Sequence, residues 1–443
     1  MPHPSGRRMA RAMASERANS ETLLNTTVVL YVVLWIFEGA VRKWIPSLDG
    51  PMYVFRDLIV TTVLLGLFLK RGVPAGTILA TVSLVSFGIL QSITLNVDVM
   101  VITLGLRAMI APLLLLALLF SAASPLRTDL IPRVVLMVLP LQTLLVIVQV
   151  SSDRSSSWNR QTGGEEAYFT TADDIVRAAG TFSAPAGLIA FCGIATVSLL
   201  VLWPKWSNPV LKLTSATLLI AMLGLSGSRG AVFICGVLVI AWVLRARASS
   251  RPTRLPMLAG VALTASVTIA IIGFLLPNVT GAFQERFVAA SSSENTALRI
   301  LTSAFGYLVT DLQPLGSGLG VHSSSGRAVG SAGEWIEDDS ARWVAEMGVL
   351  GLWLGVLRSF IGLLLLILAT RRRDWTEAQH LTATYLGVLL VAGSVTTNPS
   401  TQGAVAIIAV WLASEFKSRN RLKGVDDEDS HQHASVSAEQ RRD

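Results

Sequence analysis

The sequence predicts an all-α fold: a polytopic membrane helix bundle of about 12 transmembrane helices, with a large outer loop that contains an amphipathic helix. First, hydrophobic residues make up 52% of the 443 positions and charged residues 15%, which leaves too little polar surface to cover a soluble globule. Second, apolar stretches recur at the length that crosses a bilayer, about 20 residues. Third, basic residues gather in alternate connections between these stretches.

The candidate spans follow the apolar runs from one end of the chain to the other. In the first half they are 23–40, 57–69, 76–95, 99–120, 134–150 and 186–203. In the second half they are 209–224, 230–244, 255–276, 343–370, 379–396 and 402–416. The predicted organisation is a cytoplasmic N-terminus (1–22), nine spans with an outer loop at 151–185 (23–277), a large outer loop (278–341), three spans (342–416) and a polar, disordered cytoplasmic tail (417–443).

The distribution of basic residues predicts which connections face the cytoplasm. Arg7, Arg8, Arg11 and Arg17 precede the first span and place it with its start inside. The even-numbered connections that follow are also basic, as at Lys70. The net charge of +7 is therefore a topology signal. It does not indicate nucleic-acid binding, which needs basic residues clustered on a folded soluble face.

The sequence predicts neither a metal nor a cofactor. The only cysteines, Cys192 and Cys235, both fall inside predicted spans, and the five histidines are scattered without metal-ligand spacing. At such positions the two cysteines are expected to act as small apolar core residues.

An amphipathic helix is predicted in the large outer loop, with Asn295 as N-cap and Pro314 as the stop. Its apolar positions recur at intervals of three and four residues: Leu298, Leu301, Phe305, Leu308 and Leu312. Such a helix would lie on the membrane surface, either as a structural lid or as part of a binding site.

Three glycines follow that helix, at Gly316, Gly318 and Gly320. Their spacing is not that of a dinucleotide fingerprint, and no strand-to-helix context surrounds them. They favour a plain or tight turn, or a loop whose backbone N–H groups approach a phosphate.

Charged residues concentrate where the predicted spans meet the outer face. Four arginines stand there, each near the start or end of a span or on the amphipathic helix: Arg42, Arg229, Arg299 and Arg342. A guanidinium binds phosphate oxygens bidentately and keeps its charge, so their convergence favours an anionic ligand. Taken singly, each arginine is also compatible with an interfacial side chain or a salt bridge.

Two further arginines, Arg107 and Arg358, fall inside predicted spans, where a charge is costly and is a functional candidate by default. The sequence offers no carboxylate at matching depth for Arg358. This residue either faces a polar cavity or its span is misplaced.

Several segments resemble the bacterial O-antigen ligase and polysaccharide polymerase superfamily of membrane glycosyltransferases. These are GLSGSRGAVF around Arg229, ALRI followed by PLGSGLG after Arg299, EDDSARWVAEMGVLGLW around Arg342, and EGAVRKWIPS with YVFRD near the N-terminus. The resemblance implies a metal-independent enzyme in the bacterial inner membrane whose active site faces the periplasm. It would transfer a glycan from a polyprenyl-pyrophosphate donor to a hydroxyl of a glycan or lipid-linked acceptor, in O-antigen or exopolysaccharide synthesis.

The resemblance also implies roles for single residues. Arg229 and Arg299 would bind the pyrophosphate, with Arg42 and Arg342 as secondary contacts. Ligases of the superfamily carry a histidine where this chain has Glu337, followed by Asp338. Glu337 or Asp338 would then orient or deprotonate the acceptor hydroxyl. Polymerase and ligase both stay open, beside a transporter or flippase of lipid-linked glycans and a non-enzymatic scaffold.

Overall fold

The computed structural model describes residues 4–71, 74–121, 126–162, 176–248, 266–268, 270, 273–274, 281, 296–396 and 399–439. Over these residues the chain forms helices and no strand, which confirms the predicted all-α class. The α-helices are α1 (Pro4–Trp44), α2 (Asp49–Arg71), α3 (Ala75–Leu95), α4 (Val99–Ser121), α5 (Leu130–Ser151), α6 (Pro185–Leu202), α7 (Pro209–Leu225), α8 (Arg229–Ala248), α11 (Thr296–Phe305), α12 (Ser324–Ala328), α13 (Asp339–Arg371), α14 (Glu377–Ala392) and α15 (Pro399–Glu439). Short 3₁₀ turns are η1 (Pro46–Leu48), η2 (Ser157–Asn159), η3 (Trp203–Lys205) and η4 (Gly306–Leu308).

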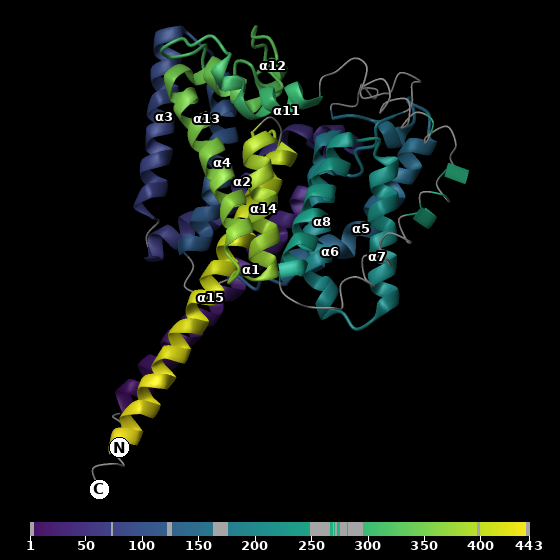
Figure 1. The fold of residues 1–443 in the computed structure, drawn as a ribbon. Helices are drawn as coiled ribbons and strands as arrows, with labels where there is room; N and C mark the ends of the chain where they lie inside the picture. Colours follow the sequence, from purple (N-terminus) through teal and green to yellow (C-terminus); the bar gives the residue numbers. More distant parts are fainter. Residues whose placement is uncertain are drawn as a thin grey trace.

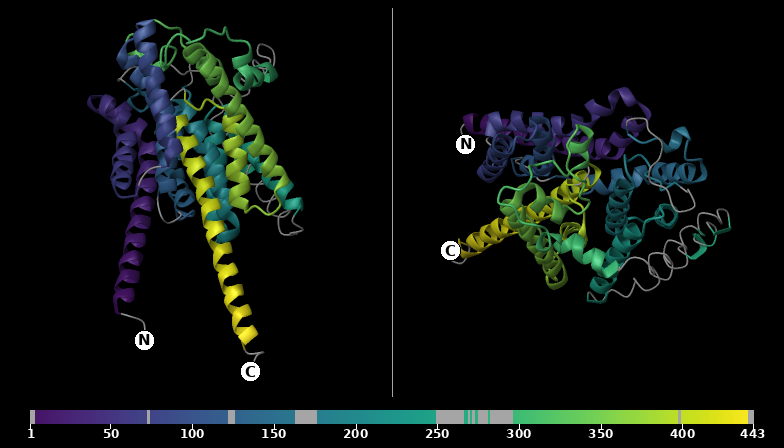
Figure 2. Two further views of the ribbon diagram at one scale, coloured as in Figure 1. Left: turned by 90° about the vertical axis from the view of Figure 1, so that its left-hand side faces the viewer. Right: turned by 90° about the horizontal axis from the view of Figure 1, so that it is seen from above.

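The long helices run side by side as a bundle with two distinct ends (Figure 1). At one end, which we call the loop end, lie α11 and α12. From the opposite end, the tail end, the first part of α1 and the last part of α15 project as two separate rods (Figure 2). The start of α1 and the end of α15 therefore lie on the same side of the bundle, as the predicted even number of spans requires.

Within the described residues, six helices are long and apolar enough to cross a membrane, which makes this a multi-pass membrane protein. They are Glu21–Trp44, Ala75–Leu95, Val99–Phe120, Leu130–Ser151, Pro185–Lys205 and Asp339–Arg371. The predicted spans 57–69, 209–224, 230–244 and 402–416 also lie within helices, α2, α7, α8 and α15, and most of 379–396 lies in α14. Most of the predicted span 255–276 lies outside the described residues.

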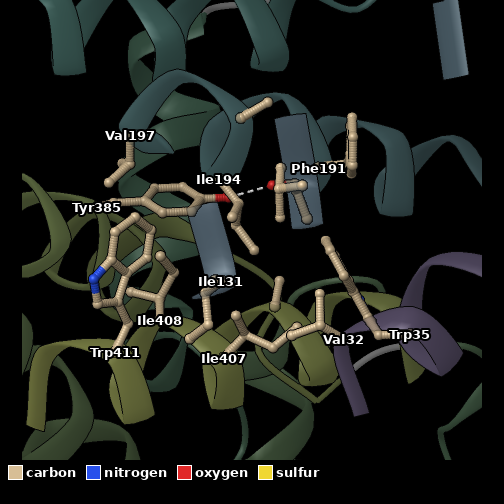
Figure 3. Packing of buried hydrophobic residues seen from close by; sticks show 14 of the residues in the cluster. Val32, Trp35, Ile131, Phe191, Ile194, Val197, Tyr385, Ile407, Ile408 and Trp411 are labelled. Atoms are coloured by element: carbon tan, nitrogen blue, oxygen red, sulfur yellow. Dashed lines mark hydrogen bonds between the residues drawn. The ribbon is translucent and has the colours of Figure 1, made fainter. Parts of the chain in front are cut away.

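Helix α6 forms the centre of the bundle. Of its most apolar stretch, 83% is buried, and it contacts α5, α7, α8, α14 and α15. Around it pack large side chains of the neighbouring helices, among them Trp35 of α1 and Trp411 of α15 (Figure 3). The Tyr385 hydroxyl of α14 donates to the Ala190 carbonyl oxygen of α6 at 2.9 Å. One turn further along α6, Gly193 faces the same ring, and a Cβ there would lie 2.4 Å from the Tyr385 hydroxyl oxygen.

Helix α3 lies at the edge of the bundle, and only 11% of its most apolar stretch is buried. Leu79 and Ile93 are 69% and 76% exposed, and both are large apolar side chains. Exposure of these side chains to water would be unfavourable. Their contact with lipid is not, because the acyl chains are as apolar as leucine. The edge position of α3 therefore agrees with a membrane environment.

Helix α13 is not one straight helix but two arms joined at Gly348. This residue has φ 58° and ψ −128°, outside the helical region. Beyond it the chain turns back, because a Cβ on Gly351 would lie 1.8 Å from the Trp343 carbonyl oxygen. The short arm, 339–347, thus packs along the beginning of the long arm, 349–371. The predicted span 343–370 lies within α13, and the bend at Gly348 falls near its start.

Helix α15 continues to Glu439, whereas the sequence predicts a disordered tail from residue 417. Extending an existing helix adds one hydrogen bond for each residue ordered, whereas a new helix must first be nucleated. The buried part of α15 supplies that nucleus, and the polar sequence after it contains no proline. For this reason residues 417–439 are helical, whereas the sequence predicted disorder there.

The predicted outer loop 151–185 is partly core. Thr181 and Phe182 are 1% and 0% exposed. Two glutamines of α5 hold this segment: the Gln149 side-chain oxygen accepts from the Gly180 backbone N–H at 2.8 Å, and the Gln142 oxygen accepts from the Thr181 N–H at 3.1 Å. Residues 176–184 therefore form a plug across the loop end of α5 and α6.

The helix predicted from the leucine spacing is present as α11, followed by η4, but α11 ends at Phe305, so the predicted stop at Pro314 is wrong. Leu301, Leu308 and Leu312 of the predicted stripe are 54%, 70% and 51% exposed. Ala304 and Tyr307 make the contact with the protein instead and are 2% and 7% exposed. Leu301 of α11, Leu308 of η4 and Leu312 beyond it thus point away from the bundle, as expected for a segment that lies on a membrane surface. The proposed N-cap, Asn295, lies outside the described residues.

Candidate functional site

The charged residues of the loop end form two groups, one on either side of the connection between α14 and α15. The first charge group consists of Glu38 and Arg42 of α1, Arg56 and Asp57 of α2, and Arg107 of α4. The second charge group consists of Asp339, Arg342 and Arg358 of α13.

In the first charge group, two carboxylates bind three guanidinium groups. Glu38 lies 3.4 Å from Arg42 and 3.2 Å from Arg56. Asp57 lies 3.4 Å from Arg56 and 2.8 Å from Arg107. These chained ion pairs join α1, α2 and α4, and each guanidinium that is removed from water has a carboxylate partner.

An aromatic ring lies between two of these guanidinium groups. The Arg42 guanidinium lies 4.8 Å from the centre of the Tyr53 ring, and that of Arg107 lies 4.0 Å from it. The Tyr53 hydroxyl also forms a hydrogen bond with Ser325 of α12. Tyr53 therefore connects the first charge group to the loop that covers it.

In the second charge group, two guanidinium groups share one carboxylate. Asp339 is fully buried as a side chain, 2.8 Å from Arg342 and 3.8 Å from Arg358. It also accepts from the Thr396 backbone N–H at 2.6 Å. The Arg358 guanidinium lies 5.3 Å from the centre of the Trp343 ring.

Residues after the end of α14 and at the start of α15 contact the two charge groups. Gly393 and Thr396 accept from Arg358 and Arg342 of the second group. The Pro399 carbonyl oxygen accepts from Arg56 of the first group at 3.1 Å. The second charge group is therefore held by residues that follow α14, and the first charge group by the first residue of α15.

The glycine loop packs against the bend of α13. Gly316, Gly318 and Gly320 have φ values of 68°, 112° and 84°, as a tight turn requires. The Ser317 N–H donates to the Ala345 carbonyl oxygen at 2.8 Å, and the His322 N–H donates to the Glu346 carboxylate at 3.0 Å. These backbone donors are bound to α13, so the tight-turn interpretation is confirmed and these N–H groups do not point at an empty phosphate site.

The structure places two of the four candidate arginines in ion pairs. Arg42 belongs to the first charge group and binds Asp49 as well, at 2.6 Å. Arg342 belongs to the second charge group and is 2% exposed. The two are thus held by different carboxylates, and the interpretation of each as a salt-bridge residue is confirmed.

The other two arginines lie at the same end of the bundle. Arg229 is the first residue of α8 and its side chain is half-buried. Arg299 lies on α11, and its backbone is described but its side chain is not. Helix α11 contacts α13, which carries the second charge group, and it also contacts α14.

The two candidate carboxylates precede α13 and have different surroundings. Glu337 has an exposed side chain, whereas Asp338 is half-buried. The Ser303 hydroxyl of α11 donates to the Asp338 carboxylate at 2.8 Å. Asp338 is therefore positioned against the helix that carries Arg299, and Glu337 is open to solvent.

Sequence reasoning missed the partners of the two arginines inside predicted spans. Arg107 binds Asp57 of a neighbouring helix, and Arg358 binds Asp339 of its own helix. Arg358 lies where the α14–α15 connection begins, because it donates to the Gly393 carbonyl oxygen at 3.5 Å. Both alternatives for Arg358, a polar cavity or a misplaced span, stay open, and the structure adds the carboxylate partner that the sequence did not reveal.

The arrangement provides fixed positive charge, the exposed carboxylate of Glu337 and the half-buried carboxylate of Asp338 at a single end of an apolar bundle. Such a surface favours an anionic group presented at the edge of a membrane. Comparison of the chain with protein-family models, with curated proteins and with solved structures gives no match.

Proposed function

We propose that this chain is a bacterial inner-membrane glycan polymerase or ligase of about 12 spans with its active site on the periplasmic side. It would transfer a glycan from a polyprenyl-pyrophosphate donor to an acceptor hydroxyl, in O-antigen or exopolysaccharide synthesis. The loop end would face the periplasm and the tail end the cytoplasm, as the basic residues near the termini favour.

The observation that carries this proposal is the gathering of charge at the loop end. Arg42, Arg342, the start of α8 at Arg229 and the helix that bears Arg299 all lie there. The opposite end carries the basic residues that topology alone explains. An anionic headgroup at the membrane boundary would meet Arg229 and Arg299 at this end.

The chemistry needs no group beyond those of the chain and its substrates. The bond between the anomeric carbon and the pyrophosphate oxygen breaks, and a bond from that carbon to the acceptor oxygen forms. Arg229 and Arg299 would bind the pyrophosphate and stabilise the charge that develops on its leaving oxygen. Arg42 and Arg342 are held in ion pairs, so in this proposal they position the site and add to its potential.

The acceptor proton passes to a carboxylate. Glu337 is exposed and can meet an incoming hydroxyl directly. Asp338 already accepts from Ser303, which would keep it oriented toward α11. We therefore assign the base role to Glu337 or Asp338, with the released polyprenyl pyrophosphate as the second product.

The decisive experiment supplies the purified protein in proteoliposomes with a lipid-linked oligosaccharide, without ATP or an ion gradient. Longer or transferred glycan together with free polyprenyl pyrophosphate supports the enzyme. Movement of the intact lipid-linked glycan across the bilayer without bond formation supports a flippase and rejects the proposal.

Two matched substitutions test the binding role. Arg229→Lys and Arg299→Lys keep the charge but remove the bidentate fork, and we expect each to lower the rate by about tenfold or more. Arg133→Lys is the control, because Arg133 is 63% exposed on α5 and pairs with Asp129 at 2.7 Å. Wild-type rates for Arg229→Lys and Arg299→Lys, with normal insertion, would reject the assignment.

A further inference from the structure

A small cavity lies at the loop end, apart from both charge groups. Its volume is about 20 Å³, and it opens between the end of α1, the end of α5 and the two ends of the outer loop. Its lining includes Lys43, Gln149, Trp158, Asn159, Arg160 and Arg177. A cavity of this volume accommodates one or two oxygen atoms, since about 10–15 Å³ is enough for one water molecule.

The wall of this cavity is positively charged. Lys43 is 2% exposed, and its ammonium group donates to the Gly180 carbonyl oxygen at 2.7 Å. An ammonium group has three donors, and no ion pair of Lys43 with a carboxylate is present in the described part of the chain. A buried ammonium is costly without a counter-charge, so an anion here would relieve that cost.

A second buried group in the cavity lacks a partner. Asn159 is 5% exposed and uses its side-chain N–H₂ group to donate to the carbonyl oxygens of Gln149, Ser152 and Asp153. Those three bonds fix its orientation. Its side-chain oxygen is buried and has no hydrogen-bond partner. An unused acceptor in a cavity that an ammonium group also lines calls for a ligand that can donate as well as accept.

We infer that this cavity binds the oxyanion of a ligand that also carries a hydroxyl, namely a sugar carboxylate or a phosphate. The oxyanion would meet Lys43, with Arg160 at the mouth, and the hydroxyl would donate to the side-chain oxygen of Asn159. Trp158 is 45% exposed and lies edge-on to Trp44, with 5.9 Å between ring centres. Its free face would contact the apolar face of a sugar ring.

The sugar form of this inference rests on the proposed function, because a glycan-transferring enzyme must hold its substrate on the same side. The binding of an oxyanion in this cavity does not depend on the proposed function. The site would then select glycans with an acidic sugar, such as a uronic acid, next to the reacting end.

The test is binding to the full-length protein in phosphatidylcholine nanodiscs, measured by titration calorimetry without any lipid-linked donor. The probes are D-glucuronate, inorganic phosphate and D-glucose, and nanodiscs with phosphatidylglycerol test a lipid headgroup as competitor. We expect glucuronate or phosphate to bind at least about tenfold more tightly than glucose, since a charge-assisted hydrogen bond accounts for about that factor. Competition by phosphatidylglycerol alone would identify the ligand as a lipid.

Two substitutions locate the binding. Lys43→Gln should weaken anion binding by about tenfold, and Arg160→Gln by about threefold. Arg160 is exposed, so its replacement leaves the fold intact even if Lys43→Gln unfolds the plug. Arg133→Gln at the tail end is the control and should bind as the wild type does. Equal binding of glucose and glucuronate, or unchanged binding in Arg160→Gln, would overturn the inference.

These outcomes are separable from the proposed function. Binding is measured in the absence of transfer, so an inactive protein can still bind glucuronate. Conversely, transfer activity with no anion binding would leave the proposed function in place and reject this site.

Discussion

The side chains of Asp339 and Arg358 lie 3.8 Å apart although nineteen residues separate them on the same helix. A straight α-helix would separate them by about 28 Å. The turn at Gly348 brings them together, and Arg342 binds the same carboxylate at 2.8 Å. A single backbone feature thus creates the second charge group.

Replacement of Gly348 tests whether the bend is essential. Gly348→Ala should destabilise strongly, because φ is +58° and the new Cβ would lie 2.0 Å from the Gln313 carbonyl oxygen. Gly330→Ala is the matched control, since Gly330 also has positive φ, 93°, but no atom within 4 Å of the new Cβ. Strain alone costs about 1–2 kcal/mol, so only Gly348→Ala should exceed that cost in detergent unfolding. Equal losses would mean that the contact is unimportant.

Because Arg342 and Arg358 share the carboxylate of Asp339, we expect Asp339→Asn to lower the stability of the protein strongly. Two buried guanidinium groups would lose their common partner, which should cost about 3–5 kcal/mol. Asp129→Asn, which removes an exposed partner of Arg133, should cost at most about 1 kcal/mol. Thermal unfolding in detergent compares the two. If Arg358→Met added to Asp339→Asn restored no stability, the unpaired charge would not be the cause.

Helix α6 packs so closely against α14 that Gly193 has no room for an added atom. Gly193→Ala would place a methyl group 2.4 Å from the Tyr385 hydroxyl oxygen, and we expect about 1–3 kcal/mol of destabilisation from overpacking. Gly236→Ala on α8 has open space around its Cβ and should be neutral or slightly stabilising. Melting temperatures of the two variants, purified in the same detergent, provide the measurement. A Gly193→Ala protein as stable as Gly236→Ala would contradict the close packing.

Orientation can be tested by cysteine labelling in intact cells. Ser324→Cys, at the start of α12 at the loop end, is exposed and should react with a membrane-impermeant maleimide. Arg133→Cys at the tail end should react only after permeabilisation. The native Cys192 and Cys235 are buried and provide an unreactive background. The reverse pattern would place the loop end in the cytoplasm and remove the proposed periplasmic site.

Much of the fold could be predicted from sequence because membrane insertion depends on local composition. A helix in lipid must satisfy its own backbone hydrogen bonds, so each apolar run of sufficient length becomes a helix wherever its neighbours lie. The leucine spacing that predicted α11 is equally local. Basic connections follow the same logic, since they depend only on which side of the membrane a segment reaches.

What the sequence by itself determined about this protein is its class, most of its helices and the concentration of charge at one end. Only the tertiary structure decided which charges meet. Asp339 pairs with Arg358 because the chain reverses at Gly348, and Asp57 pairs with Arg107 because α2 packs against α4. Such pairings depend on distances in space between residues far apart in sequence, which no local pattern of hydrophobicity or charge encodes.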